Sequence, residues 1–175
     1  MKSSLIVSLL LASGLMAADY SKVVEQPDAS EIIKKDLLGP VTTYKMPADC
    51  ITDDAKAIAR GAYIFHNLNG DKAKGDLPEG LSKKNPDGKA KQYGNCVACH
   101  NIEGAKGAGN IGPDLHAYHA NFIKTGARDN AFVFQKIADA RVDNADTKMT
   151  INLTTKLFNE REICDITSYI VSIKK

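Results

Sequence analysis

The chain has 175 residues, of which 25% are charged and 43% are hydrophobic, and its formal net charge at pH 7 is +2. This length and hydrophobic content suffice to build one core, so we expect a single globular domain. The near balance of charges, without a concentrated basic field, argues against a nucleic-acid-binding protein.

The amino terminus has the pattern of a secretory signal peptide. Lys2 supplies a positive charge, residues 5–11 are mostly apolar, and Ala17 and Ala18 are small residues suited to a cleavage site. We expect residues 1–18 to be removed after export. An uncleaved membrane anchor is the alternative, but the apolar stretch is short for a membrane span, so we expect no stable anchor.

Residues 19–52 are predicted to form an irregular N-terminal arm, because prolines at three positions interrupt any long periodic pattern. Within this arm, residues 31–38 have the composition of a short helix that Gly39 would end.

The first long helix is predicted over residues 53–66, with Thr52 as its N-cap and Asp53 and Asp54 in its first turn. The apolar side chains expected together on one side repeat at helical spacing: Ile58, Ala62 and Phe65.

Gly61 lies inside this predicted helix. A glycine destabilises a helix interior by roughly 1 kcal/mol relative to alanine, so its presence indicates that another backbone approaches closely at this point. A merely tolerated glycine is the alternative.

Residues 69–92 form a lysine- and glycine-rich insertion with six lysines and four acidic residues. A stretch of this length without a regular pattern is uncommon inside a compact domain and is usually functional or mobile. We weigh two interpretations equally: a loop that contacts a partner, and a solvated insertion.

Residues 96–100 read Cys-Val-Ala-Cys-His, the pattern that attaches a c-type haem covalently. Two thiols three residues apart can reach both vinyl groups of one porphyrin, and His100 can then bind the iron. A redox pair of the thioredoxin type would need a βαβ context, and a zinc site would need a second pair of ligands, neither of which the sequence provides. We therefore predict one haem c attached to Cys96 and Cys99.

Because haem is joined to such chains only after they cross a membrane, we expect the mature protein in the periplasm.

A glycine-rich segment, residues 104–115, follows the motif and is expected to wrap closely around a flat cofactor. Within it, Pro113 supplies a carbonyl in a rigid turn. We predict that Nδ1–H of His100 donates to this carbonyl, which would fix the ring and its tautomer while Nε2 binds the metal.

The second axial ligand of the iron is predicted to be Met149. It follows His100 by 49 residues, so the chain has room to pass around the porphyrin and return on the far side. A thioether ligand stabilises ferrous iron and so raises the reduction potential. The other candidates are Met46, His66, His116 and His119.

Two further helices are predicted after the motif. The first covers residues 130–142, with Asn130 as N-cap and an inward face of Val133, Phe134, Ile137 and Ala138. The last begins at Asn159, which forms a capping-box pattern with Glu162, and its inward face is Ile163, Ile166, Ile170 and Ile173. No strand pattern competes with these helices, so the sequence predicts an all-α fold.

The remaining cysteines, Cys50 and Cys164, form an even pair in an oxidising compartment. A disulfide between them would close a long loop, for which chain entropy predicts a stabilisation of at most about 4.8 kcal/mol. Two buried free thiols are the alternative, and the sequence leaves the choice open because it does not fix the distance between the two Cα atoms.

These features resemble the class I cytochrome c family over residues 53–175. The resemblance rests on the early helix with Gly61 and Phe65, the motif at 96–100, the Gly-Pro-x-Leu pattern at 112–115, a late methionine, and a closing helix with Tyr169. It implies a helical domain wrapped around one haem c, in which the first and last helices cross with Gly61 against the surface around Tyr169.

A narrower resemblance is to the SoxX family, the monohaem subunits of the SoxAX cytochrome complexes of bacterial thiosulfate oxidation. It rests on residues 94–100, residues 109–115, Asp139-Ala140-Arg141 and Thr147-Lys148-Met149, whereas Thr150 stands where that family usually has proline. It implies a heterodimer with a SoxA-like cytochrome subunit, which carries the cysteine at which thiosulfate is joined to a sulfur-carrier protein. This chain would then contribute no catalytic residue to the L-cysteine S-thiosulfotransferase complex, and would pass electrons to a small soluble cytochrome c.

Two other functions are compatible with the haem motif. A free-standing class I electron carrier of a respiratory chain is supported by the motif equally well. A haem enzyme with an open iron position is disfavoured while Met149 is available to close that position.

Overall fold

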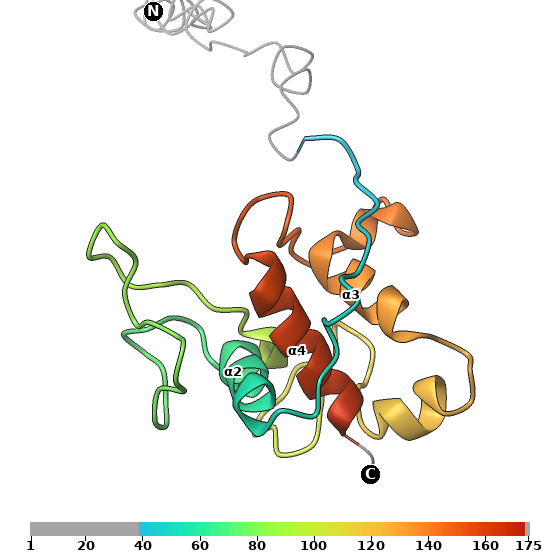
Figure 1. Ribbon diagram of the computed structural model, residues 1–175, viewed down its shortest axis with the longest axis horizontal. Coiled ribbons are helices and arrows are strands. Elements are labelled where there is room, and N and C mark those ends of the chain that lie inside the picture. Colours follow the sequence, from blue (N-terminus) through green and yellow to red (C-terminus); the bar gives the residue numbers. More distant parts are fainter. Residues whose placement is uncertain (1–38, 174–175) are drawn as a thin grey trace, which may run out of the picture. The chain divides into compact units, whose positions relative to one another are not determined.

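The computed structural model describes residues 39–173, so the predicted signal peptide, the first part of the arm and the predicted helix over 31–38 lie outside the described residues. Three α-helices are present in this range: α2 (Ala55–His66), α3 (Asn130–Ala138) and α4 (Glu160–Ser172) (Figure 1). Three short helical turns join them: η3 (Cys96–Ala98), η4 (His119–Ile123) and η5 (Ala140–Val142). The β-structure of residues 39–173 consists of two isolated bridges, one of which joins Asn69 to Gln92. The predicted all-α fold is confirmed.

Helix α2 packs closely against α4, and Gly61 makes this contact possible. A Cβ atom added at Gly61 would lie 2.0 Å from the carbonyl oxygen of Asp165 and 2.9 Å from Cβ of Tyr169. The predicted close approach is therefore confirmed, and it involves the residue predicted from the resemblance, Tyr169.

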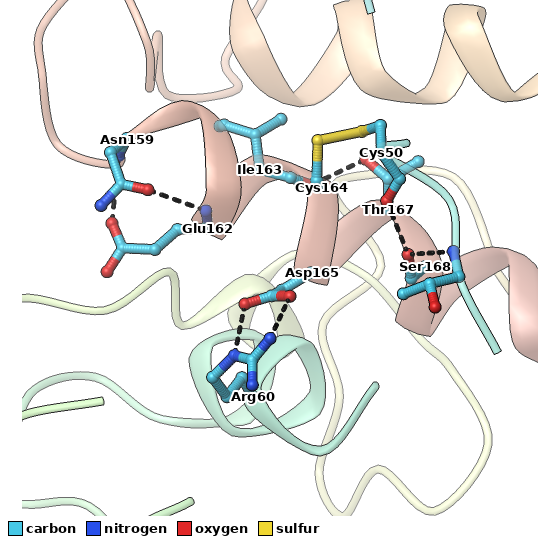
Figure 2. The surroundings of a disulfide bond; sticks show 10 residues. Cys50, Arg60, Asn159, Glu162, Ile163, Cys164, Asp165, Thr167 and Ser168 are labelled. Atoms are coloured by element: carbon cyan, nitrogen blue, oxygen red, sulfur yellow. Dashed lines mark hydrogen bonds and ion pairs between the residues drawn. A yellow bond between two sulfur atoms is a disulfide. The ribbon is translucent and has the colours of Figure 1, made fainter. Parts of the chain in front are cut away.

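A buried ion pair that no local sequence pattern indicates crosses the same interface. Nε and Nη2 of Arg60 donate to the two carboxylate oxygens of Asp165 over 2.7 and 2.9 Å (Figure 2). The two side chains are only 8% and 6% exposed. Such a fork-to-fork geometry is specific as well as strong, so it helps to fix how α2 lies on α4.

The start of α2 differs from the prediction. Asp54 is the N-cap, and its carboxylate accepts from the backbone N–H groups of Lys56 and Ala57, both over 3.2 Å. Thr52 instead accepts from the N–H of Asp54 over 3.0 Å. The helix therefore begins two residues later than expected, because the aspartate reaches two free N–H groups where the threonine reaches one backbone group outside the helix.

The buried stripe of α2 also runs differently. Phe65 is buried as expected, but Ile58 and Ala62 are only partly buried. The buried positions of α2 include Ala57, Gly61 and Ile64, and Gly61 among them lies against α4.

Helix α3 is shorter than predicted, and Asp139 is the reason. Its backbone is extended (φ −156°, ψ 101°), and its side chain accepts from the N–H of Arg141, which starts the separate turn η5. The N-cap is Asp129, not Asn130, since the Asp129 carboxylate accepts from the N–H of Phe132 over 2.7 Å. The predicted inward face of α3 is buried: Val133, Phe134, Ile137 and Ala138.

Helix α4 begins as predicted. The Asn159 side chain accepts from the N–H of Glu162 over 2.9 Å, and the Glu162 carboxylate accepts from the N–H of Asn159 over 3.0 Å (Figure 2). This reciprocal capping box satisfies two free donors at the helix start. Three of the four predicted inward isoleucines are buried, and the fourth, Ile173, is partly buried at the C-cap.

Cys50 and Cys164 are joined by a disulfide, with their Cα atoms 4.9 Å apart and 114 residues apart in sequence. Ser168 supports the same contact, because its Oγ donates to the carbonyl of Cys50 over 3.2 Å and accepts from the N–H of Thr52 over 3.2 Å (Figure 2). The segment that leads into α2 is thus fastened to the middle of α4.

Replacing Cys164 with serine is expected to lower the free energy of unfolding by about 3 kcal/mol, because an open chain gains the entropy that the long closed loop had lost. Chemical denaturation with and without a reductant measures this. The reductant should destabilise the wild-type protein by a similar amount and leave the variant unchanged. Equal stability of variant and oxidised wild-type protein would show that the bridge contributes nothing.

Candidate haem site

The Cys-x-x-Cys-His motif begins at the turn η3 and is held on the C-terminal end of α2. The N–H of Gly94 donates to the carbonyl of Ile64 over 3.0 Å, and the N–H of Asn95 donates to the carbonyl of Asn67 over 2.9 Å. Asn95 caps η3 in a left-handed conformation with φ of 45°, which asparagine tolerates better than most residues do. The position of the motif therefore depends on the position of α2.

Gly94 is a structural residue of this site that the sequence analysis did not explain. A Cβ atom there would lie 2.6 Å from Sγ of Cys96 and 3.2 Å from the carbonyl oxygen of Ile64. Any larger residue would displace the first cysteine of the motif. The only sequence signal was the glycine itself, standing two residues before the motif.

The glycine-rich segment 104–115 lies directly against the motif backbone. The N–H of Gly109 donates to the carbonyl of Val97 over 2.9 Å, and the N–H of Gly112 donates to the carbonyl of Cys99 over 2.8 Å. A Cβ atom at Gly109 would lie 1.9 Å from the carbonyl oxygen of Ala98. Gly109 and Gly112 are thus required because this segment lies in close contact with the motif itself. The sequence predicts only that the segment wraps around a cofactor.

The ring of His100 is fixed by its neighbours on this segment. Its Nδ1 lies 2.8 Å from the carbonyl oxygen of Pro113, so the predicted hydrogen bond is present in the structure. A carbonyl can only accept, so Nδ1 carries the proton and the neutral ring keeps its lone pair on Nε2. This is the tautomer that a metal ligand needs, and the ring therefore fits an iron at Nε2.

Gly112 allows the ring to take this place. A Cβ atom added at Gly112 would lie 2.4 Å from Cε1, 2.6 Å from Nδ1 and 2.8 Å from Nε2 of His100. The ring thus lies directly on the glycine backbone.

Replacing Gly112 with alanine is therefore expected to tilt or expel the His100 ring, which would alter the axial ligation of a bound haem. The absorption spectrum of the oxidised holoprotein checks this. Gly104 is the matched control, because it has φ of +77° and open space around it, so alanine there strains the backbone without touching the ring. Identical spectra for both variants and the wild-type protein would contradict the prediction.

Cys96 and Cys99 are not joined to each other by a disulfide, and both are partly buried. Burial raises the pKa of Cys96 to about 12, whereas a redox-active pair needs a lowered thiol pKa. Among residues 39–173, no group of three or more His, Cys, Asp or Glu side chains is placed to hold a metal ion. The raised pKa of Cys96 disfavours the redox-pair interpretation of the motif.

Two of the histidine candidates for the second axial position have other partners. Nε2 of His66 lies 2.8 Å from the Tyr169 hydroxyl, and burial lowers the pKa of His66. Nδ1 of His116 lies 2.9 Å from a carboxylate oxygen of Asp114.

The two methionine candidates, Met46 and Met149, are both partly buried against the hydrophobic core. Met46 belongs to the arm, and Met149 belongs to the connection between η5 and α4, where its N–H donates to Oγ1 of Thr147 over 3.1 Å. Burial alone does not distinguish them, and Met149 stays a prediction.

An all-α domain with this motif and a metal-ready histidine defines a haem-binding protein of the class I cytochrome c type. The family model described as Cytochrome c matches residues 86–174, about half of the chain. The chain therefore belongs to the cytochrome c family, which binds haem c covalently and transfers electrons through its iron. No curated protein matches the chain.

The family also bears on where the protein works, since a cytochrome c domain is typically extracytoplasmic. Within residues 39–173, no helix has both the length and the apolar character required to cross a bilayer.

Proposed function

We propose that this cytochrome is the monohaem electron-transfer subunit of a periplasmic SoxAX-type complex that oxidises thiosulfate. In this proposal Cys96 and Cys99 would hold the haem through thioether bonds, and His100 and Met149 would bind its iron. Pro113 accepts the hydrogen bond that orients His100. The bound iron supplies one-electron redox chemistry between its ferric and ferrous states.

The observation that carries the ligand assignment is the environment of His100. The Pro113 carbonyl at 2.8 Å holds the Nδ1 proton, and the contact with Gly112 sets the plane of the ring. A histidine that only filled space in the core would need neither a glycine packed against its ring nor a carbonyl that binds the Nδ1 proton. Both constraints lie on the segment that is hydrogen-bonded to the motif, so ring and cysteines are positioned together.

Support for a subunit, as opposed to a minimal carrier, comes from the insertion over 69–92, which is fastened to the domain. The N–H of Gly70 donates to the carbonyl of Lys91 over 2.8 Å and so joins the two ends of the insertion, while the Tyr93 hydroxyl, just outside it, donates to the carbonyl of Ser82 over 2.8 Å. Nζ of Lys91 also pairs with the carboxylate of Glu162 at the start of α4. An insertion held in place in this way presents a defined and largely exposed surface that a partner subunit could contact.

The reaction of the proposed complex releases two electrons. Thiosulfate joins the thiol of a sulfur-carrier protein to give a thiosulfonate, R–SH + S₂O₃²⁻ → R–S–SSO₃⁻ + H⁺ + 2e⁻. In this proposal the new S–S bond would form on the SoxA-like partner, which would carry the reacting cysteine. The role of this chain would be to accept the electrons singly and pass them to a small soluble cytochrome c.

Purification of the tagged chain from its native host at low salt tests this proposal. A stoichiometric second c-type cytochrome that co-elutes, and thiosulfate-dependent reduction of the complex with a carrier protein present, would support it. A chain that elutes only as a monomer and is reduced by respiratory donors, but not by thiosulfate with its carrier, would make it a free-standing electron carrier.

A further inference from the structure

The connection that follows α3 contains a carboxylate with no exposed surface. Asp139 is 0% exposed, and its two oxygens accept several hydrogen bonds. Arg141 donates to it through Nε over 2.9 Å, Nη2 over 2.7 Å and its backbone N–H over 3.1 Å. Oγ1 of Thr154 donates over 3.1 Å, and the N–H of Thr42 donates over 3.4 Å. Asp139 thus joins three segments that are distant in sequence.

One of these segments is the part of the chain that directly follows Met149. Ile151 and Asn152 are buried. The Asn152 side-chain amide donates to the carbonyl of Ile137 over 2.8 Å, and the N–H groups of Asn152 and Leu153 donate to the carbonyl of Ala138 over 3.1 and 3.0 Å. The chain is therefore hydrogen-bonded to the end of α3 from the third residue after Met149 onward.

The N-terminal arm also contacts the residues around Asp139. The Tyr44 hydroxyl lies 2.9 Å from Oγ1 of Thr154, and the N–H of Tyr44 donates to Oε1 of Gln135 over 2.7 Å. Nη1 of Arg141 donates to the carbonyl of Gly39 over 3.0 Å. Loss of the Asp139 carboxylate would release contacts to both the arm and the Met149 connection.

We propose that Asp139 is a positioning residue that holds the Met149 segment in place for axial ligation, an inference that rests on the proposed role of Met149 as a ligand. A neutral thioether is a replaceable ligand for ferric iron, and hydroxide or an amine competes with it more strongly as the pH rises. The more strongly residues 151–154 are held in place, the larger is therefore the fraction of molecules in which the thioether stays bound to the iron. Hydrogen bonds donated by Arg141 lower the pKa of Asp139 to about 2, so the charge of Asp139 is constant throughout such a titration.

Alkaline titration of the thioether-to-iron absorption band in the oxidised holoprotein tests this inference. For Asp139→Asn, we expect the pH at which half of the band is lost to fall by about one unit, a tenfold change in the detachment equilibrium. Thr154→Val, which removes one hydroxyl, should shift it in the same direction by less. The matched control is Asp143→Asn, which neutralises a half-exposed carboxylate paired with Lys136 and should leave the titration unchanged.

The possible results separate this inference from the ligand assignment. Met149→Ala should abolish the band; if the band persists, the ligand assignment is wrong and the role of Asp139 fails with it. If Met149→Ala abolishes the band but Asp139→Asn and Thr154→Val titrate like the wild-type protein, only the role of Asp139 is wrong. A merely structural role would lower the denaturation midpoint without moving the titration. If Asp139→Asn does not fold, Thr154→Val decides by the same criterion.

Discussion

Replacing Gly61 with alanine is expected to lower the free energy of unfolding by about 3 kcal/mol, the upper range for overpacking. At an exposed helix position the same change would stabilise by roughly 1 kcal/mol. The sign reverses here because the new Cβ would lie 2.0 Å from the Asp165 carbonyl oxygen, so α2 and α4 would have to separate. Separation would also weaken the Arg60–Asp165 pair and displace the end of α2 that holds the haem motif.

Chemical denaturation of the variant, together with its haem content after export, measures both consequences. Ala59→Gly is the matched control, because Ala59 is exposed on the same helix and should lose only about 1 kcal/mol through helix propensity. A Gly61→Ala variant at least as stable as the wild-type protein would mean that the two helices do not make this contact.

Replacing Met149 with alanine is expected to abolish the thioether-to-iron absorption band of the oxidised protein. It should also lower the midpoint potential by roughly 0.1 V or more, since changes of axial ligand alter haem potentials over a range of about 0.8 V. The physical reason is that a thioether stabilises ferrous iron, whereas water or another hard ligand in its place favours ferric iron. Absorption spectroscopy and a redox titration of the holoprotein provide the two readouts.

Met46→Ala is the matched control for this prediction, since Met46 is also partly buried against the core. We expect its band and potential to match those of the wild-type protein. If Met46→Ala loses the band and Met149→Ala keeps it, the arm supplies the ligand instead.

Much of the fold could be predicted because the relevant patterns are local. The capping box of Asn159 and Glu162 lies within four consecutive residues, and the isoleucines of α4 repeat at helical spacing. Gly61 pointed correctly to a close backbone contact because a helix interior disfavours glycine without such a reason. The helix ends were less predictable, since Asp54 and Asp139 act as caps through side-chain orientations that composition does not specify.

The parts that could not be predicted depend on contacts between distant residues. Arg60 lies in an amphipathic pattern as a charged residue that would normally be exposed, and only its partner Asp165, 105 residues later, explains its burial. The Cys50–Cys164 bridge cannot be predicted for the same reason, since it depends on a Cα separation that follows from the completed fold.

The candidate site shows the same division. The motif at 96–100 and the hydrogen bond from His100 to Pro113 follow from short spacings. The hydrogen bonds to Asp139, in contrast, connect Thr42 with Thr154, which are more than 100 residues apart. The choice between Met46 and Met149 also depends on how distant segments close around the haem, which the local sequence does not determine.

The most direct test of this account is intact-mass and peptide analysis of the exported, purified protein. We predict a red protein whose mass exceeds that of the mature chain by one haem, with the haem on the peptide that contains Cys96 and Cys99 and with no free thiol at either position. A colourless protein with the mass of the bare chain, or a haem attached to any other peptide, would contradict the account.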